Sequence, residues 1–256
     1  MRVGGFSPID VVGRGSAPQQ PVQQRILDTI RTPSLPTIVA RLNALLDDAE
    51  VGTPEIGAAI AEDPSIAAMV LRVANSSAYG LREPVVDIQR AAVVLGVRQL
   101  SSIVLRVAVI RQFAHLPPSA DLDLIELWKH SILTAQLAQA LGRKARAPLV
   151  LAPEELYTCG LLHDLGKVVL YDNFGEHYLN IVRDARERDR PLWQSELEEF
   201  EFSHPQVGGV VAFLWSLGSD LEAAIDLHHG TPAEIRTDAA VSITALADRI
   251  ANRVQA

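Results

Sequence analysis

The sequence Leu161-Leu162-His163-Asp164-Leu165-Gly166-Lys167 places an imidazole and a carboxylate side by side in an otherwise apolar run. Such a run is typical of a buried helix end, where an unpaired carboxylate would cost several kcal/mol. A divalent metal ion would compensate both side chains, because it takes neutral imidazole nitrogens and carboxylate oxygens as ligands. Successive helical residues point about 100° apart, so an ion that reaches both must lie between their directions and needs ligands from other helices.

On both sides of this stretch, apolar residues recur at three- and four-residue steps, the spacing of helices with one buried face. In the second half of the chain this pattern predicts helices over residues 125–141, 153–165, 174–188, 205–217, 221–229 and 238–254. In the first half, Thr53 and Asp63 each precede a proline and can cap a helix. Further helices are predicted over residues 88–95 and 99–113. Alternating strand patterns are nearly absent, so the sequence predicts an all-α, multi-helix fold.

Proline and glycine divide the chain into segments. Residues 1–20 contain four glycines and two prolines without a sustained period, and we predict a flexible tail there. Pro117-Pro118-Ser119 interrupts the helical pattern a second time. The sequence therefore predicts two helical subdomains, residues 21–118 and residues 119–256.

The composition limits the class of protein. Of the 256 residues, 48% are hydrophobic, which is enough for a sizeable core. The single cysteine, Cys159, cannot form an intramolecular disulfide, and the chain does not open like a secretory leader. No apolar run approaches the roughly 18 residues of a membrane span. We therefore expect a cytoplasmic protein with no membrane partner.

Charge is distributed unevenly between the two halves. Residues 1–118 hold 11 basic and 10 acidic residues, and residues 119–256 hold 12 and 21, so the halves carry net charges of +1 and −9. A strongly acidic half repels phosphate backbones. Together with the absence of a basic recognition helix, this predicts that nucleic acid is not a partner.

Further metal-ligand types occur in the second half at His130, His204, His228-His229 and Asp248. Each of them has a purely structural interpretation when it is taken alone, for example a histidine at a helix start or an acidic residue on a solvated face. Their number, their order and the helical placement of each favour a metal site, or a hydrogen-bond network derived from one. Mixed histidine and aspartate ligands suit zinc, iron, manganese or nickel better than calcium.

Other polar residues are assigned structural roles. We interpret His115 and His177 as surface residues, and Asn75-Ser76-Ser77 as groups that satisfy a helix end. The acidic cluster Glu196, Glu198, Glu199 and Glu201 is typical of a solvated surface. Glu199 or Glu201 lies close enough to His204 in the sequence to join a metal site there.

The order His130, His163-Asp164 and Asp248 resembles the HD superfamily of metal-dependent phosphohydrolases, in which these positions bind metal. His204 and His228-His229 are similar to the additional ligands of the HD-GYP branch, which holds more than one metal ion and hydrolyses cyclic di-GMP. The chain departs from that branch after His229, because residues 230–234 read Gly-Thr-Pro-Ala-Glu and contain no Gly-Tyr-Pro motif. We therefore expect no cyclic di-GMP hydrolysis.

The first half resembles one particular relative of these enzymes. Residues 60–65 (Ile-Ala-Glu-Asp-Pro-Ser), 71–80 (Leu-Arg-Val-Ala-Asn-Ser-Ser-Ala-Tyr-Gly) and 91–96 (Ala-Ala-Val-Val-Leu-Gly) are similar to the signature of HDOD domains, and the likeness runs from about Ile26 to Val254. The resemblance implies an N-terminal helical subdomain packed on an HD-like helical subdomain. It also implies a regulatory or output module in bacterial signalling that acts through protein partners.

Two mechanisms follow from the resemblance. In an enzymatic one, the chain is a metal-dependent phosphohydrolase, a phosphodiesterase or nucleotidase. An ion at His130, His163, Asp164 and Asp248 would then activate water, a second ion at His204, His228 and His229 would stabilise an oxygen, and Lys167 would face the phosphate. In a regulatory one, the same residues hold one ion or two, of iron, manganese, zinc or nickel, and fix the helices. The absence of a recognisable substrate motif favours the regulatory mechanism, and a small phosphate-containing ligand stays open as a partner.

Overall fold

The computed structural model describes residues 20–46, 48, 51–77, 80–145, 149, 151–236 and 238–255, with the backbone alone for residue 98. Within these residues the chain forms fifteen helices and no strand, which confirms the predicted all-α fold. The predicted tail lies outside the described residues except for Gln20.

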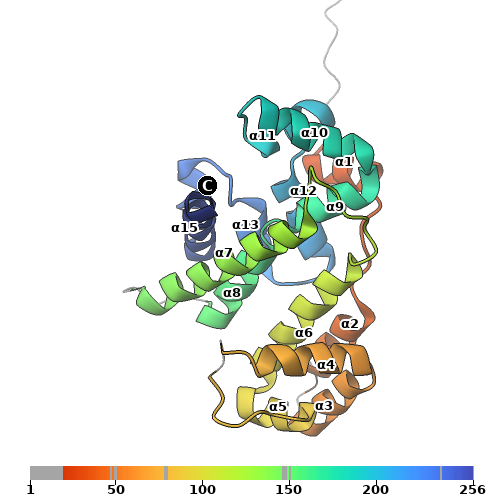
Figure 1. The fold of residues 1–256 in the computed structure, drawn as a ribbon, viewed down its shortest axis with the longest axis vertical. Coiled ribbons are helices and arrows are strands. Elements are labelled where there is room, and N and C mark those ends of the chain that lie inside the picture. The colour runs from red at the N-terminus through yellow and green to blue at the C-terminus, as the bar shows by residue number, and fades with distance from the viewer. Residues whose placement is uncertain are drawn as a thin grey trace, which may run out of the picture.

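Five helices form the lower part of the molecule in Figure 1: α2 (Thr37–Leu46), α3 (Thr53–Ala61), α4 (Pro64–Ala74), α5 (Ile88–Leu95) and α6 (Val97–Gln112). They surround one buried apolar cluster, which includes Leu42, Ile60, Val70, Leu100 and Ile103. This clustering follows from the helical spacing of the apolar residues, since each helix presents one apolar face to the others.

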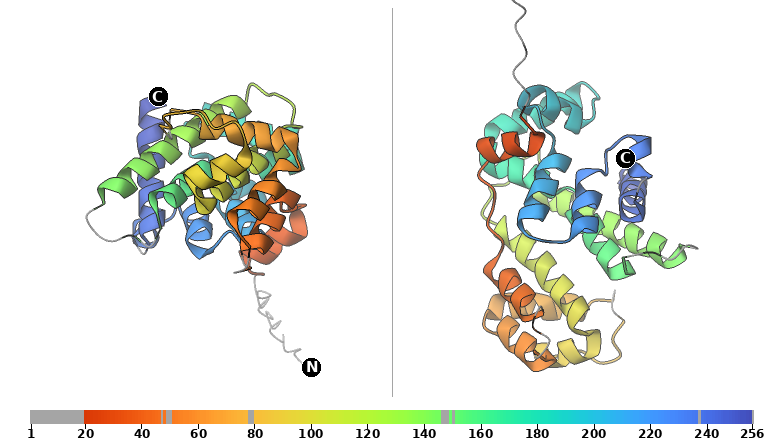
Figure 2. Two further views of the ribbon diagram at one scale, coloured as in Figure 1. Left: turned by 90° about the horizontal axis from the view of Figure 1, so that it is seen from below. Right: turned by 180° about the vertical axis from the view of Figure 1, so that it is seen from behind.

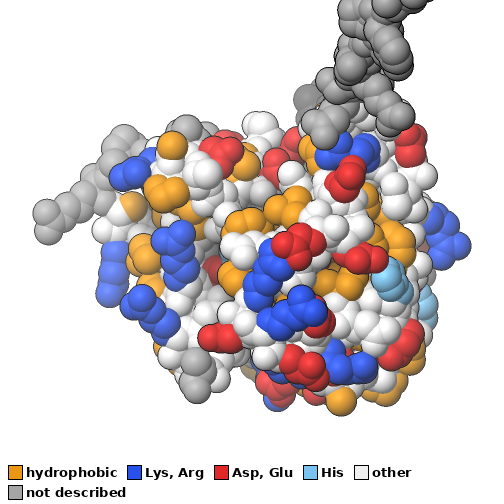
Figure 3. Space-filling model, turned by 90° about the horizontal axis from the view of Figure 1, so that it is seen from above, with side chains coloured by type: hydrophobic (Ala, Val, Ile, Leu, Met, Phe, Trp, Pro, Cys, Tyr) orange, Lys and Arg blue, Asp and Glu red, His pale blue; other side chains and the backbone are white. Residues whose placement is uncertain are grey.

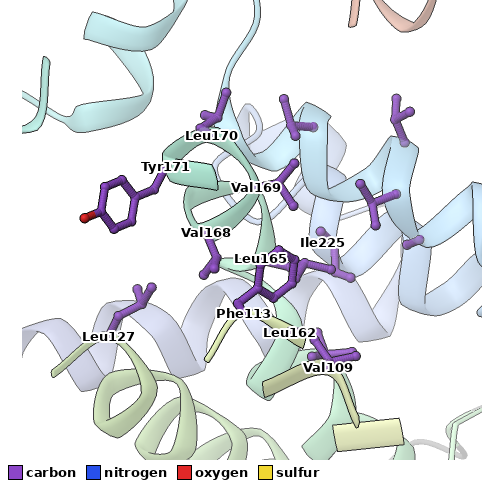
Figure 4. Packing of buried hydrophobic residues seen from close by; sticks show 14 of the residues in the cluster. Val109, Phe113, Leu127, Leu162, Leu165, Val168, Val169, Leu170, Tyr171 and Ile225 are labelled. Carbon is purple, nitrogen blue, oxygen red and sulfur yellow. The ribbon is translucent and has the colours of Figure 1, made fainter. Parts of the chain in front are cut away.

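Nine helices form the upper part: α7 (Leu124–Lys144), α8 (Pro153–Leu162), α9 (Leu165–Phe174), α10 (Glu176–Glu187), α11 (Leu192–Phe200), α12 (His204–Leu214), α13 (Ser219–Asp226), α14 (Pro232–Ile235) and α15 (Ala239–Gln255). The long helix α7 packs along α8 and α15, and α12 packs against α9 and α13. A second, larger apolar cluster fills the space between these helices. Leu162, Leu165 and Ile225 lie near its centre (Figure 4).

Helix α6 connects the two parts (Figures 1 and 2). Its Leu100 and Ile103 belong to the lower cluster, whereas its Val109, together with Phe113, belongs to the upper one. The first helix, α1 (Val22–Thr29), packs on α12 in the upper part, and its Ile26 belongs to the upper cluster. The division of the chain at residue 118 stays a prediction, but α1 lies with the later helices.

Local sequence explains the helix ends of the lower part. Asp63 caps α4 as predicted, because its Oδ1 accepts the backbone N–H groups of Ser65 at 3.0 Å and of Ile66 at 3.2 Å. The prediction for α3 was wrong, since Gly52 and not Thr53 is the residue before that helix. The Asn75 side chain exchanges two hydrogen bonds of 2.8 Å with the backbone of Val85. The role of the Asn75 side chain is thus structural, but it binds the segment before α5 and not, as the sequence had predicted, a helix end.

The helices of the upper part differ from the prediction. The predicted helix over residues 153–165 ends at Leu162, and a separate helix, α9, begins at Leu165. Helices α9, α11 and α14 were not predicted as helices of their own. Gly175, at a φ of 51°, then separates α9 from α10, a conformation that glycine adopts readily.

The surface is mixed in character. The face seen from above carries hydrophobic side chains among charged groups of both signs (Figure 3). Within the described part of the chain, none of the helices combines the length and apolar character that a membrane span needs.

Candidate metal centre

His163 and Asp164 lie at the junction of α8 and α9, not inside one helix. The backbone turns here, with Asp164 at φ −94° and ψ 13°. Two glycines flank the pair and let neighbouring helices approach it. A Cβ on Gly160 would lie 2.7 Å from the Ala135 Cα of α7, and one on Gly166 would lie 1.9 Å from the His204 carbonyl oxygen of α12. The turn therefore brings the pair against α7 and α12, which carry further ligand-type residues.

The first group of side chains comes from α7, from the α8–α9 junction and from α15. Ligand atoms of His130, His163 and Asp164 lie within 4.8 Å of one another. Asp248 joins them, because its Oδ1 lies 3.0 Å from His130 Nε2 and 3.5 Å from His163 Nε2. Gln255 holds the other side of the His130 ring, with its Oε1 2.8 Å from His130 Nδ1.

The second group comes from the α8–α9 junction, the start of α12 and the turn after α13. It consists of Asp164, His204, His228 and His229, whose ligand atoms also lie within 4.8 Å of one another. Asp164 Oδ1 lies 3.4 Å from His204 Nε2 and 3.7 Å from His228 Nε2. Its Oδ2 lies 3.4 Å from His163 Nε2. Asp164 therefore belongs to both groups, with one oxygen facing each.

Three buried imidazoles are held in one tautomer through their Nδ1 atoms. His163 Nδ1 donates to the Gly160 carbonyl at 2.8 Å, and His228 Nδ1 donates to the Ile225 carbonyl at 2.7 Å. His204 Nδ1 faces Glu196 Oε2 at 2.7 Å. Since carbonyl and carboxylate oxygens only accept, Nδ1 carries a proton and Nε2 is the nitrogen that is left to bind a metal ion. This is how surrounding groups orient histidines that bind metal.

Four atoms that face the inside of the cluster make no hydrogen bond to the described protein. His163 Nε2, His204 Nε2, His228 Nε2 and Asp164 Oδ1 are buried and have no hydrogen bond among the described residues. Buried polar atoms are otherwise almost always paired. Four unsatisfied atoms around one space, on side chains of the types that bind transition metals, fit a bound cation.

The chain matches one protein family over most of its length: the HDOD domain, over residues 32–231. The chain belongs to the HDOD domain family. The match ends before α15, the helix that carries Asp248.

Two individual relatives resemble the chain. An uncharacterized protein of Treponema pallidum is 26% identical over 200 residues, which cover 78% of this chain and 38% of that protein. The chain thus spans well under half of the length of this curated relative. The crystal structure of an HDOD domain protein of unknown function from Geobacter sulfurreducens is 28% identical. It matches with a TM-score of 0.74 over 89% of this chain and 76% of its own.

A third comparison concerns the fold alone. A protein from Shewanella amazonensis that is described as a candidate phosphohydrolase has a TM-score of 0.73, and the match covers 91% of this chain and 80% of that one. Its sequence identity is 23%. The helical architecture of this chain is therefore shared with a protein described as an HDOD domain protein and with one described as a candidate phosphohydrolase.

The electrostatics of the first group keep the carboxylates charged. Burial, the largest influence, favours the neutral ring of His163, but Asp164 and Asp248 outweigh it and raise the pKa of His163 to about 10. Burial also favours the neutral acid of Asp164, yet His163 and Lys167 hold its pKa well below the usual value. A cation that binds here takes the place of the proton on His163.

The second group differs, because burial favours the neutral form of two of its rings, those of His228 and His229. Burial lowers the pKa of His228 to about 4, and burial together with the neighbouring His228 and His204 lowers that of His229 to about 2. Neutral imidazole is the form that binds metal. The ring centroids of His228 and His229 are 4.1 Å apart.

Lys167 does not have a free ammonium group of the kind that the sequence-based enzymatic mechanism assigned to it. Its Nζ donates to Asp164 Oδ2 at 2.6 Å, and its side chain is 18% exposed. The ammonium that was predicted to face a phosphate, if the protein is an enzyme, therefore pairs with a carboxylate of the cluster.

Four other residues lie outside the centre. His115 and His177 are surface residues, as expected, with side chains 62% and 53% exposed. The prediction that Glu199 or Glu201 could join His204 was wrong. Glu199 pairs with His177 at 3.1 Å, and Glu201 lies 3.7 Å from Arg25. Both carboxylates lie away from the buried face of α11.

Glu196 was interpreted as a surface residue and is fully buried. Its carboxylate accepts the His204 backbone N–H at 2.7 Å and the Tyr178 hydroxyl at 2.6 Å, besides the His204 ring. A signal was present in the sequence: Trp193, Glu196, Leu197 and Phe200 follow the i, i+3, i+4, i+7 pattern of one helix face. An acid on that face indicates a buried partner.

Proposed function

We propose that this HDOD domain is a regulatory module of bacterial signalling that acts through protein partners, and that its His/Asp cluster holds one or two transition-metal ions that fix the helices. One observation carries the metal assignment: three histidine Nε2 atoms and Asp164 Oδ1 are buried within the cluster and make no hydrogen bond to any described residue. The ions would join α7, the α8–α9 junction, α12 and α15, since each supplies a ligand-type side chain.

Burial of the cluster supports a structural role for the ions over catalysis. His163, Asp164, His204 and His228 are each at most 2% exposed. Two cavities of the structure, one beside α2 and one beside the start of α7, are lined by other side chains. A catalytic metal keeps an open position for substrate or water, and a phosphoester would have to displace packed side chains to reach these atoms.

Metal analysis tests the first part of the proposal. We expect a transition metal to copurify with protein prepared without chelators, at about one or two equivalents. Removing it with a chelator should lower the melting temperature, because the ion binds only the folded chain. Less than about a tenth of an equivalent, with no uptake on adding iron, manganese, zinc or nickel, would contradict the assignment.

A metal-dependent phosphohydrolase is the second candidate function, and the set of ligand-type residues favours it. A bound transition metal would activate water and orient a phosphoester. The ligands alone do not position a substrate, and correct placement can contribute roughly 7–11 kcal/mol of barrier reduction. The chain from Gly230 through α14 supplies no tyrosine for that purpose.

We therefore expect no hydrolysis of cyclic di-GMP by protein loaded with iron or manganese. The reaction is followed by chromatography, with His163→Ala as the control for contaminating activity. Linear product from the wild-type protein at more than about one turnover per hour, absent from the variant, would favour the enzymatic function over the regulatory one.

A further inference from the structure

A cavity that is separate from the metal cluster lies where the lower and upper parts of the molecule meet. It has a volume of about 640 Å³ and lies between α2, the starts of α6 and α8, and the loop from α12 to α13. None of the cluster's ligand-type residues lines it. Pockets for small ligands span about 300–1,000 Å³ and often lie between domains, so this cavity has the size and the place of a binding site.

The cavity combines apolar walls with a few hydroxyl groups. Leu42, Leu105 and Leu221 contribute from α2, α6 and α13. Ser102 and Thr158 hydrogen-bond to each other across the α6–α8 contact at 2.8 Å. The Ser101 hydroxyl oxygen beside them is buried and has no partner in the described part of the chain. A ligand with an apolar body and one hydrogen-bonding end would satisfy it.

The charged side chains that line the cavity are all acidic. Glu154, Glu155 and Asp220 line it, and its described lining contains no lysine, arginine or histidine. Glu155 is engaged by the Ala152 backbone N–H at 2.7 Å, and Glu154 lies 3.3 Å from Arg143. Asp220 makes no ion pair with any described residue and lies in the first turn of α13.

Helix starts reduce this negative charge without cancelling it. The starts of α6, α8 and α13 all border the cavity, and each carries roughly half a positive charge. Together they offset about half of the three carboxylate charges. With Arg143 counted as well, a negative excess remains.

We propose that this cavity binds a small organic cation, an amine with an apolar body, whose ammonium group pairs with Asp220. The site lies at the contact between the two parts, so its ligand touches helices of both. This inference is independent of the metal cluster and of its proposed role.

Three ligands with the same apolar body test the charge preference: 4-phenylbutylamine, 4-phenylbutanol and 4-phenylbutyrate, titrated into the full chain by calorimetry and by NMR. We expect the amine to bind with a Kd below about 1 mM and the carboxylate to bind at least about tenfold more weakly. Backbone shifts should map to Val97, Ser101, Thr158 and Asp220. Equal or tighter binding of the carboxylate, or shifts elsewhere, would overturn the proposal.

Variants separate the site from general effects of charge. Asp220→Asn should weaken amine binding by about five- to tenfold. Glu222→Gln, two residues further in the same helix turn but outside the cavity, should leave it unchanged. Ser101→Leu places a larger apolar side chain in the wall of the cavity and should weaken amine binding, and a melting curve shows that the variant is folded. An amine affinity that all three variants leave unchanged would refute the assignment.

Discussion

Asp164→Asn is expected to remove metal from both groups of the cluster at once. The substitution keeps the shape of the side chain but replaces a carboxylate that faces both groups with a neutral amide. We expect the metal content to fall below about a tenth of an equivalent, and the chelator to have no further effect on the melting temperature.

The size of the effect follows from the position of Asp164. Its two oxygens face different histidines, Oδ2 toward His163 at 3.4 Å and Oδ1 toward His204 at 3.4 Å. No other residue belongs to both groups of ligand atoms. An ion at about 1,000 times its Kd stabilises the folded chain by about 4 kcal/mol, so the variant should lose a shift of that order. The measurements are plasma emission and paired melting curves.

Two variants serve as controls for Asp164→Asn. Asp172→Asn removes a partly buried carboxylate of α9, which pairs with His115 outside the cluster, and should retain the metal. Asp248→Asn changes only the first group, where Asp248 lies beside His130 and His163, so it should lose at most one of two equivalents. Full retention of metal by Asp164→Asn would contradict the shared position of this carboxylate.

The ligand-type residues could be found from the sequence because one pair stands out by itself, and the number and order of the others favour a site when they are taken together. A histidine and an acid within an apolar run need compensation, and this argument selects His163-Asp164 without knowledge of the fold. The same holds for His228, which follows an apolar helix end. The structure brings all seven predicted positions into one cluster, although the sequence alone could not supply the distances between helices.

What the sequence did not predict depends on tertiary contacts. Residues 161–167 were taken as the end of one helix, but the chain turns between Leu162 and Leu165 because α9 must pack against α12. That contact is nonlocal, so local periodicity does not contain it. Glu196 was missed for a different reason. It was grouped with three neighbouring acidic residues as a solvated cluster, and the helical spacing that places it on the same face as Trp193 and Phe200 was not considered.

Gly166→Ala is expected to destabilise the chain by more than about 3 kcal/mol and to weaken metal binding at the second group. Alanine favours helices over glycine by about 1 kcal/mol, so the local preference of α9 opposes this result. The added methyl group would lie 1.9 Å from the His204 carbonyl oxygen and 2.7 Å from its carbonyl carbon. Both are backbone atoms, and no change of side-chain rotamer can move them.

Gly142→Ala provides the contrast that makes this prediction specific. Its methyl group would also be crowded, at 2.3 Å from Leu156 Cδ1, but that atom ends a side chain that can rotate. We therefore expect Gly142→Ala to cost less than about 2 kcal/mol and to keep its metal. Because α12 must retreat from α9 in Gly166→Ala, His204 moves with it and the second group loses a ligand. Urea denaturation and metal analysis of both variants test the prediction. Equal losses of stability in the two variants would contradict it, because they would show that the backbone contact between α9 and α12 can adjust as readily as the side chain of Leu156.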